Sequence, residues 1–230
     1  MQDKQIIPAE MILPNKLFII PIMGKPVFPG IFTPIMIESS DDIHVVEESM
    51  SVDSLVGLVL LENEDTEKPA GKDLYTVGTA AKIVRRINLP DGGINIFIST
   101  LKRFRIKKIL NNDPPIIAAV EYIEDTNADS IEVKALTRSL ISEMKTLSEN
   151  NPLFSEEVRL NMVNIDHPGK IADFITSILN IDRAAQQKIL ETENVYKRME
   201  QVLVFIKKEQ ELLKIQKKIS FLQNSQATQD

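Results

Sequence analysis

Histidine and cysteine, the side chains that most often ligate transition metals or attack substrates, are scarce in this chain. It has no cysteine and only two histidines among 230 residues, which excludes disulfides, thiolate metal sites and a cysteine nucleophile. His44 and His167 lie far apart in the sequence and form no H-x-x-x-H spacing. A solitary histidine in or near the start of a helix is more often a surface or capping residue than a ligand, so we expect no metal site.

Nucleotide-binding and nucleophile motifs are also missing from the sequence. Gly24-Lys25 lacks the upstream glycine and the following hydroxyl residue of a G-x-x-x-x-G-K-[ST] phosphate loop. Gly92-Gly93 lies in an expected turn with no helix after it, which is unlike a dinucleotide fingerprint. No G-x-S-x-G elbow occurs. The sequence therefore indicates no catalytic residue and no cofactor-binding residue in this chain.

The segment LKRFRIKK (101–108) is the strongest candidate for a nucleic-acid-binding strand. Alternation along a strand places Arg103, Arg105 and Lys107 on one face and Phe104 on the other. A basic face in contact with water explains this pattern as well as contact with RNA does. Because the net charge is −6 and the chain has no Trp to stack on bases, we favour the solvated face and do not expect nucleic acid as a partner.

The segment KPVFPGIFTPIMIE (25–38) combines three prolines and a glycine with many apolar residues. Proline disfavours both a regular helix and an uninterrupted central strand. Two explanations stay open: a bulged edge strand that closes a small β-barrel, or an apolar lip exposed for contact with another molecule. For any single residue the core is the more common place. The residues that we expect in an exposed lip are Phe28, Pro29, Ile31 and Phe32.

The secondary structure expected in the first half of the chain is mostly β. Short apolar runs bounded by Pro, Gly or charged residues predict strands within residues 17–23, 33–38, 55–61, 74–87, 93–106 and 116–124. The order Pro90-Asp91-Gly92 predicts a hairpin turn between the fourth and fifth of these. One helix is expected at 41–50, with Ser40 or Asp41 as its N-cap. The composition changes near Asn111–Pro115, where we expect the β part to join a helical part.

After residue 125 the apolar residues recur with the period of a helix. Leu136, Leu140, Met144 and Leu147 form one stripe, and Asp129 and Glu132 have capping-box spacing. A short helix is expected after Pro152. Two further helices are expected to begin near Asp166 and Asp182.

The last segment predicts a long helix of about 30 residues. Apolar residues recur at a spacing close to 3.5 residues: Val195, Met199, Val202, Ile206 and Leu213, followed by Leu212, Ile215, Ile219 and Leu222. At 1.5 Å per residue such a helix is about 45 Å long, which exceeds the size of the small bundle before it. We expect it to project, with coiled-coil or other helix-on-helix packing beyond this domain.

The N-terminal residues lack the features of a secretory signal, and no run approaches the roughly 18 apolar residues that a membrane span requires. We therefore expect a cytoplasmic protein with no membrane partner.

Several separated motifs together resemble the N-terminal substrate-recognition domain of the Lon ATP-dependent protease. They are I-P-I-x-x-x-P-V-F-P-G-x-x-x-P-I-x-I (20–37), L-Y-x-V-G-T-x-A (74–81), L-P-D-G (89–92) and H-P-G-K-I-A-D (167–173). The resemblance extends over about residues 14 to 219.

The resemblance implies an α+β fold in which a β-rich pseudo-barrel is followed by a helical bundle and a long projecting C-terminal helix. The boundaries that we expect are a flexible N-terminus (1–13), the β-rich substrate-recognition lobe (14–124), the bundle (125–190), the long helix (191–222) and a flexible tail (223–230). The long helix would lead to an ATPase–protease core that this chain does not contain. ATP and magnesium would belong to that core, as would the catalytic residues.

The resemblance also implies a binding role. The domain would recognise unfolded, damaged or degron-bearing proteins and help deliver them to the core of a hexamer. Two alternatives remain, a stand-alone Lon-domain adaptor and an element that mainly assembles the hexamer. A nucleic-acid-binding barrel is a third, weaker alternative, whose binding would fall steeply with salt.

The missing motifs lead to a first prediction, that this chain alone hydrolyses neither ATP nor peptides. The measurement is turnover of ATP and of a fluorogenic peptide by the purified chain. Turnover that persists after contaminating enzymes have been removed would contradict the prediction.

Overall fold

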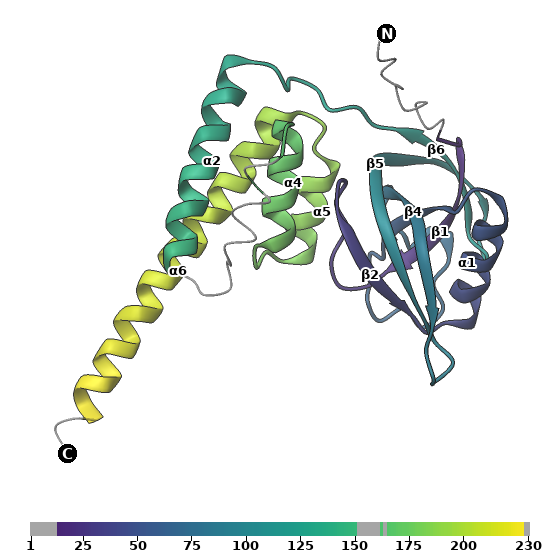
Figure 1. Ribbon diagram of the computed structural model, residues 1–230, viewed down its shortest axis with the longest axis horizontal. Helices are drawn as coiled ribbons and strands as arrows, with labels where there is room; N and C mark the ends of the chain where they lie inside the picture. Colours follow the sequence, from purple (N-terminus) through teal and green to yellow (C-terminus); the bar gives the residue numbers. More distant parts are fainter. Residues whose placement is uncertain (1–12, 151–161, 163–164, 228–230) are drawn as a thin grey trace, which may run out of the picture.

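The computed structural model describes residues 13–150, 162 and 165–227, and it separates a β-rich lobe from a helical lobe (Figure 1). The N-terminal half of the chain forms the β-rich lobe. The helical lobe lies beside it, and the last helix extends away from both lobes toward the C-terminus (Figure 1). This α+β organisation is the one expected from the sequence.

The β-rich lobe is built on a six-stranded sheet. Its strands are β1 (Lys16–Ile22), β2 (Phe32–Ile37), β3 (Leu55–Leu60), β4 (Val77–Asn88), β5 (Ile94–Asn111) and β6 (Ile117–Tyr122). Their order is β2-β5-β4-β3-β1-β6, and β5 also pairs with β6. This additional pairing closes the sheet on itself except at β2, which pairs with β5 alone.

The strands form where the apolar runs predict them. Every residue of β3 is buried, as a continuous apolar run implies. The β4–β5 hairpin turns at the predicted Pro90-Asp91-Gly92 sequence, where Gly92 has a φ of +95°. β5 is long, with 18 residues: β2 pairs with its first part and β6 with its second part, while β4 pairs along both.

Helix α1 (Ser40–Val52) packs on the β-rich lobe, which also contains a 3-10 turn, η1 (Gly71–Asp73). The helical lobe contains α2 (Ile131–Asn150), α4 (Pro168–Ile178), α5 (Arg183–Glu191) and α6 (Val195–Ala227). The caps differ by one or two residues from those expected. Ser39 caps α1, and His167 caps α4 in place of Asp166, whereas Asp182 caps α5 as predicted.

The core of the helical lobe consists of apolar stripes on α2, α4 and α6. The predicted residues Leu140, Met144 and Leu147 of α2 are buried. They share one cluster with Val195, Met199, Val202 and Ile206 of α6 and with Ile171 and Ile175 of α4. The expected helical period is therefore confirmed, because its apolar residues face a common core.

The apolar residues in the second half of α6 are more exposed than those in its first half. The helix has 33 residues, which corresponds to about 50 Å at 1.5 Å per residue. Its later apolar residues are about half exposed or more: Leu212, Ile215, Ile219 and Phe221. Among the described residues, no helix is long and apolar enough to span a membrane.

The prediction that the β part joins the helical part at Asn111–Pro115 is wrong. This segment connects β5 to β6 inside the β-rich lobe, and the chain leaves that lobe only after Tyr122. The prolines indicated a break correctly, but it is a turn between strands. Helix α6 also continues to Ala227, beyond the expected end of the long helix at 222. The expected flexible N-terminus up to 12 and the short helix after Pro152 lie outside the described residues.

Candidate functional site

The four residues that we expected in an exposed lip do not lie together on the surface. Phe28 is fully buried and Pro29 is buried, Ile31 is half-buried, and only Phe32 is exposed, at 63%. The expectation of exposure is therefore wrong for Phe28 and Pro29. The phenyl ring of Phe28 packs in the cluster that forms the core of the helical lobe, so it connects the two lobes.

Hydrogen bonds to threonine side chains hold the segment that carries these residues. The single proton of the Thr100 hydroxyl is shared between the carbonyl oxygens of Phe28, at 2.8 Å, and Ile31, at 3.0 Å. The hydroxyl oxygen accepts from the Ile31 N–H at 2.7 Å. The Thr79 hydroxyl donates to the Val27 carbonyl oxygen at 2.6 Å. Gly30 lies in the left-handed region with a φ of +79°, which lets the chain reverse after Phe28. These contacts fix Phe28 inward.

An exposed apolar surface begins on β2, directly after this segment, and we call it the outer face. Alternation in β2 turns Phe32, Pro34 and Met36 outward, while Ile37 is buried. Phe32 and Met36 are 63% and 62% exposed. The rings of Phe32 and Phe97, on the neighbouring strand β5, are stacked with centroids 6.1 Å apart.

The strand register extends this surface onto β4. Pro34 is opposite Phe97, and Phe97 is opposite Arg85. Met36 is opposite Asn95, and Asn95 is opposite Ile87. The outer face is thus defined by the outward residues of three adjacent strands: Phe32, Pro34, Met36, Asn95, Phe97, Ser99, Lys82, Arg85 and Ile87.

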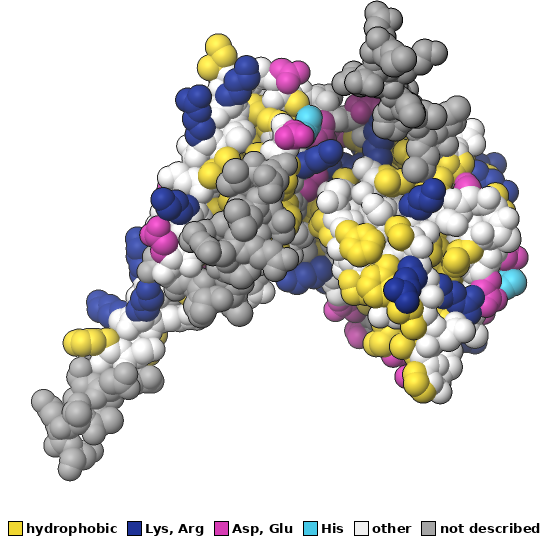
Figure 2. All heavy atoms as spheres, in the orientation of Figure 1, with side chains coloured by type: hydrophobic (Ala, Val, Ile, Leu, Met, Phe, Trp, Pro, Cys, Tyr) yellow, Lys and Arg dark blue, Asp and Glu magenta, His cyan; other side chains and the backbone are white. Residues whose placement is uncertain are grey.

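The charged residues of the outer face are basic. Lys82 and Arg85 lie on it, and it contains no carboxylate. Figure 2 shows hydrophobic side chains gathered on the β-rich lobe with Lys and Arg side chains beside them. An apolar surface of this kind is typical of a site that binds another polypeptide.

A network of buried ions joins the two lobes. The Arg103 guanidinium, on β5, donates to both carboxylate oxygens of Asp173 on α4, one of them at 2.9 Å, and to the Leu190 carbonyl oxygen at 2.9 Å. Arg198 on α6 donates to both oxygens of Asp125, at 2.5 and 3.3 Å. Its Nη1 also lies 3.5 Å from Asp173 Oδ1. We call Arg103, Asp125, Asp173 and Arg198 the junction.

The junction contradicts the solvated-face interpretation of the LKRFRIKK segment at Arg103. Arg103 is only 4% exposed, and Asp173 and Arg198 are 1% and 0% exposed. Arg105, on the same face, pairs with Glu193 at 2.7 Å. Ions that are buried this deeply need partners on every side. Arg103 and Arg105 therefore contact the helical lobe. Lys107 is 58% exposed and pairs with Glu121 of β6, as a solvated face predicts.

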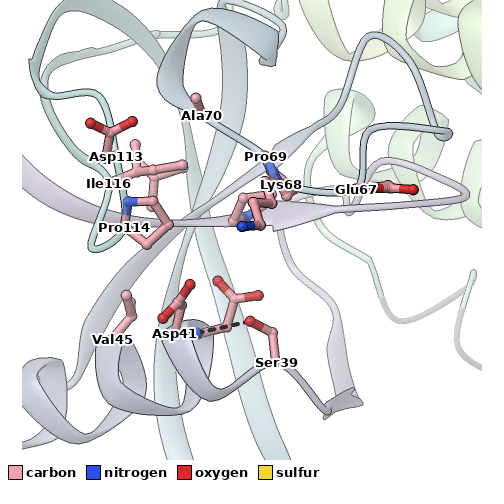
Figure 3. Close-up of a pocket in the computed structure, with 13 residues that line it drawn as sticks. Ser39, Asp41, Val45, Glu67, Lys68, Pro69, Ala70, Asp113, Pro114 and Ile116 are labelled. Carbon is pink, nitrogen blue, oxygen red and sulfur yellow. Dashed lines mark hydrogen bonds between the residues drawn. The ribbon is translucent and has the colours of Figure 1, made fainter.

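A cavity of about 260 Å³ lies at another end of the β-rich lobe. Apolar walls from β1 and the β5–β6 connection face the first turn of α1 (Figure 3). In that turn Asp41 lies across the cavity from Lys68 (Figure 3), and Asp42 also lines the cavity. Burial, and secondarily the Asp41 charge, raises the pKa of Asp42 to about 6. Among the described residues no cluster of His, Asp and Glu is suited to hold a metal ion.

Comparison with known protein families identifies the family of this domain. Residues 16–208 match the ATP-dependent protease La (LON) substrate-binding domain. The chain belongs to the Lon substrate-binding domain family. The match includes all six strands and most of the helical lobe, which confirms the resemblance found in the sequence.

Curated relatives of this Lon domain are whole Lon proteases. The chain is 57% identical over 217 residues to the Lon protease of Treponema pallidum (strain Nichols), covering 94% of the chain and 24% of that relative. It is 44% identical over 220 residues to the Lon protease of Leptospira interrogans serogroup Icterohaemorrhagiae serovar copenhageni (strain Fiocruz L1-130), covering 95% of the chain and 26% of that relative. The chain thus spans about a quarter of the length of these relatives.

Solved structures support the Lon fold. The N-terminal domain of a Mycobacterium avium complex Lon protease superimposes with a TM-score of 0.67 at 18% identity, over 84% of this chain and 98% of that one. A Lon N-terminal domain protein from Xanthomonas campestris gives a TM-score of 0.59 at 15% identity, over 82% and 97% of the two chains. At such identities the likeness is one of fold.

The sequence contained a signal for the outer face of this Lon domain that we did not use. The strand residues FTPIMI alternate, so Met36 belongs with Phe32 and not with Phe28. Phe97 and Ile87 require the register between strands, which the sequence of a single strand does not contain. The breakers Pro29 and Gly30 obscured where the alternation begins.

Burial predicts a large loss of stability on replacing one phenylalanine of this segment and a small loss on replacing another. Replacing Phe28 with Ala removes a buried ring from the core between the lobes and should lower the free energy of unfolding by about 3–5 kcal/mol. Replacing Phe32 with Ala should change it by less than about 1 kcal/mol, since that ring is mostly in water. Urea unfolding of both variants measures the difference. Equal losses would contradict the assigned burial.

The junction predicts a dependence of stability on pH. Burial raises the pKa of Asp125, but the hydrogen bond and charge of Arg198, together with the charge of Arg103, outweigh it and hold the pKa below its ordinary value. A carboxylate whose pKa is lower in the folded state contributes stability above the unfolded pKa of about 4, and this contribution is lost as the pH falls through the folded pKa.

The test is the replacement of Asp125 by Asn. Near neutral pH it should lower the free energy of unfolding by about 2 kcal/mol, and the difference from the unmodified protein should shrink below about pH 4. Glu124→Gln is the matched control, because the Glu124 carboxylate is 77% exposed and should contribute less than about 1 kcal/mol. An Asp125→Asn loss that is equally large at acidic pH would contradict the assigned role.

Proposed function

We propose that this domain captures unfolded, damaged or degron-bearing proteins on its outer face and helps deliver them to the ATPase–protease core of a Lon protease. The observation that carries the proposal is the pair of exposed side chains Phe32 and Met36, beside the half-buried Phe97, on a domain of the Lon substrate-binding family. Unfolded proteins differ from folded ones in exposing apolar side chains. A surface that recognises them must therefore be apolar and open to water.

The small number of exposed side chains on the outer face supports weak and adaptable binding. Each of its exposed large side chains can contribute on the order of 1–2 kcal/mol when it is covered, which corresponds to a several-fold to roughly thirty-fold change in affinity. Met36 adds adaptability, because an unbranched thioether side chain fits many partners. Such a surface binds many sequences without selecting one.

The proposal also covers the longer protein to which this domain would belong. We propose that the chain is the non-catalytic part of an ATP-dependent serine endopeptidase, that six copies assemble, and that the protein acts in the cytoplasm. ATP and magnesium would act in the core beyond this chain. Six outer faces in one assembly would hold a client more tightly than one, since the second contact of a bound client is intramolecular.

A second candidate function is assembly of the hexamer. It is favoured by the exposed apolar residues Leu212, Ile215 and Ile219 on the second half of α6, which match a helix that packs on another helix. In that case α6 would be the main functional element and the outer face would add little affinity. The two candidates differ in whether the isolated chain binds an unfolded protein.

The test is the double replacement of Phe32 and Met36 by Ser. It should weaken binding of β-casein, a protein without a stable fold, by roughly tenfold or more. The melting temperature should change little, because both side chains are exposed. Fluorescence anisotropy of labelled casein and thermal unfolding are the two measurements.

The matched control is Ile131→Ser, because Ile131 is 81% exposed and begins α2, away from the outer face. Its affinity for casein should equal that of the unmodified chain. Loss of binding in the control, or unchanged binding in the double variant, would contradict the proposal.

A further inference from the structure

The free edge of β2 borders the outer face. β2 pairs with β5 on one side, and no other strand of the described chain pairs with it. An unpaired strand edge presents N–H and C=O groups that can bind an additional strand.

The hydrogen bonds of the sheet show which groups of β2 point to this edge. The Ile31 carbonyl oxygen accepts from the Thr100 N–H of β5 at 2.9 Å. Main-chain groups alternate along a strand, so those of Thr33, Ile35 and Ile37 also face β5. Those of Phe32, Pro34 and Met36 face the free edge, which suits Pro34 because it has no N–H to offer to β5.

The free edge therefore carries two donors and three acceptors. The donors are the N–H groups of Phe32 and Met36, and the acceptors are the carbonyl oxygens of Phe32, Pro34 and Met36. The Pro34 carbonyl accepts a long bond, at 3.4 Å, from the Thr33 hydroxyl. Within the described part of the chain no other hydrogen bond to these five groups is present.

The edge lacks the charges that usually protect such strands. Natural edge strands are often blocked by lysine, by inward charged residues or by a covering loop, but β2 (FTPIMI) contains no charged residue. Pro34 is its one protective residue, and it removes a single donor. The side chains that flank the edge on the outer face, Phe32 and Met36, are exposed.

Space for an additional chain is present where β2 begins. A cavity of about 220 Å³ is lined by Gly30 and Ile31 just before β2 and by Ile165, Lys170 and Phe174 of the helical lobe. Its walls mix apolar side chains with the polar side chains of Asp166 and Lys170, and it lies between the two lobes next to the start of the edge.

We propose that an unfolded client binds as an extended strand paired with the free edge of β2, with alternate side chains on the outer face. The inference rests on the proposed function and specifies how the client is held. Main-chain hydrogen bonds are available from every unfolded segment and are already used in folded proteins. This mode therefore selects unfolded chains without selecting a sequence, while the apolar side chains add affinity.

Amide hydrogen exchange of the unmodified chain tests the proposal directly. In the free protein the Phe32 and Met36 amides should exchange rapidly and those of Thr33 and Ile35 slowly. Saturating β-casein should slow Phe32 and Met36 by roughly tenfold or more. Exchange of both amides that is unchanged at saturation would overturn the proposal.

Two variants at one position separate the main chain from the side chain. Met36→Ala shortens the side chain and keeps the N–H, whereas Met36→Pro keeps an apolar ring and removes the N–H. Pairing with the edge predicts that the proline variant binds casein roughly three- to tenfold more weakly than the alanine variant. Proline is compatible with this edge, because Pro34 already occupies the preceding outward position.

The outcomes distinguish this inference from the proposed function. If the unmodified chain binds casein and the proline variant binds as well as the alanine variant, strand pairing is wrong and capture on the outer face stands. If the unmodified chain does not bind casein, both are wrong. Thermal unfolding confirms that each variant is folded, and the exchange experiment decides the matter if the proline variant is not.

Discussion

The buried junction between Arg103, Asp125, Asp173 and Arg198 is the interaction on which the arrangement of this domain depends. It brings together side chains from β5, the segment after β6, α4 and α6. A buried ion pair adds little net stability compared with an apolar replacement, but removing one partner leaves an uncompensated charge. The junction therefore specifies how the lobes meet more than how firmly they adhere. Phe28 fills the adjacent core, and the position of the outer face relative to α6 follows from both.

The fold could be predicted largely from local patterns. The run LVGLVLL, the Pro90-Asp91-Gly92 turn and the stripe on α2 each specify their own element, because burial on a sheet or helix imposes a period on the sequence. The family motifs supplied the order of the elements. Arg103 could not be predicted in the same way, since the residues that accept hydrogen bonds from its side chain are 70 or more positions away in the sequence. The local sequence does not distinguish an exposed arginine from a buried one. The position of the partner carboxylate in the fold is needed for that.

The candidate site shows the same limit. Phe28 and Phe32 are similar residues in one segment, yet the Thr100 hydroxyl and the left-handed Gly30 turn the first inward before β2 begins. Composition indicated that this segment contains more apolar surface than a strand interior needs, and that was correct. Which ring is exposed depends on the register between β2 and β5. That register comes from the closed sheet and not from the segment itself.

The length of β5 has a mechanical consequence. One continuous strand carries Phe97 on the outer face and Arg103 at the junction, a separation of about 20 Å at 3.3 Å per residue. Arg103 meets Asp173, which in turn meets Arg198 near the base of α6. A polypeptide held at the outer face would therefore be connected to α6 through β5 and the junction, without an intervening loop. Force applied along α6 would reach the outer face along this strand, parallel to the β4–β5 pairing.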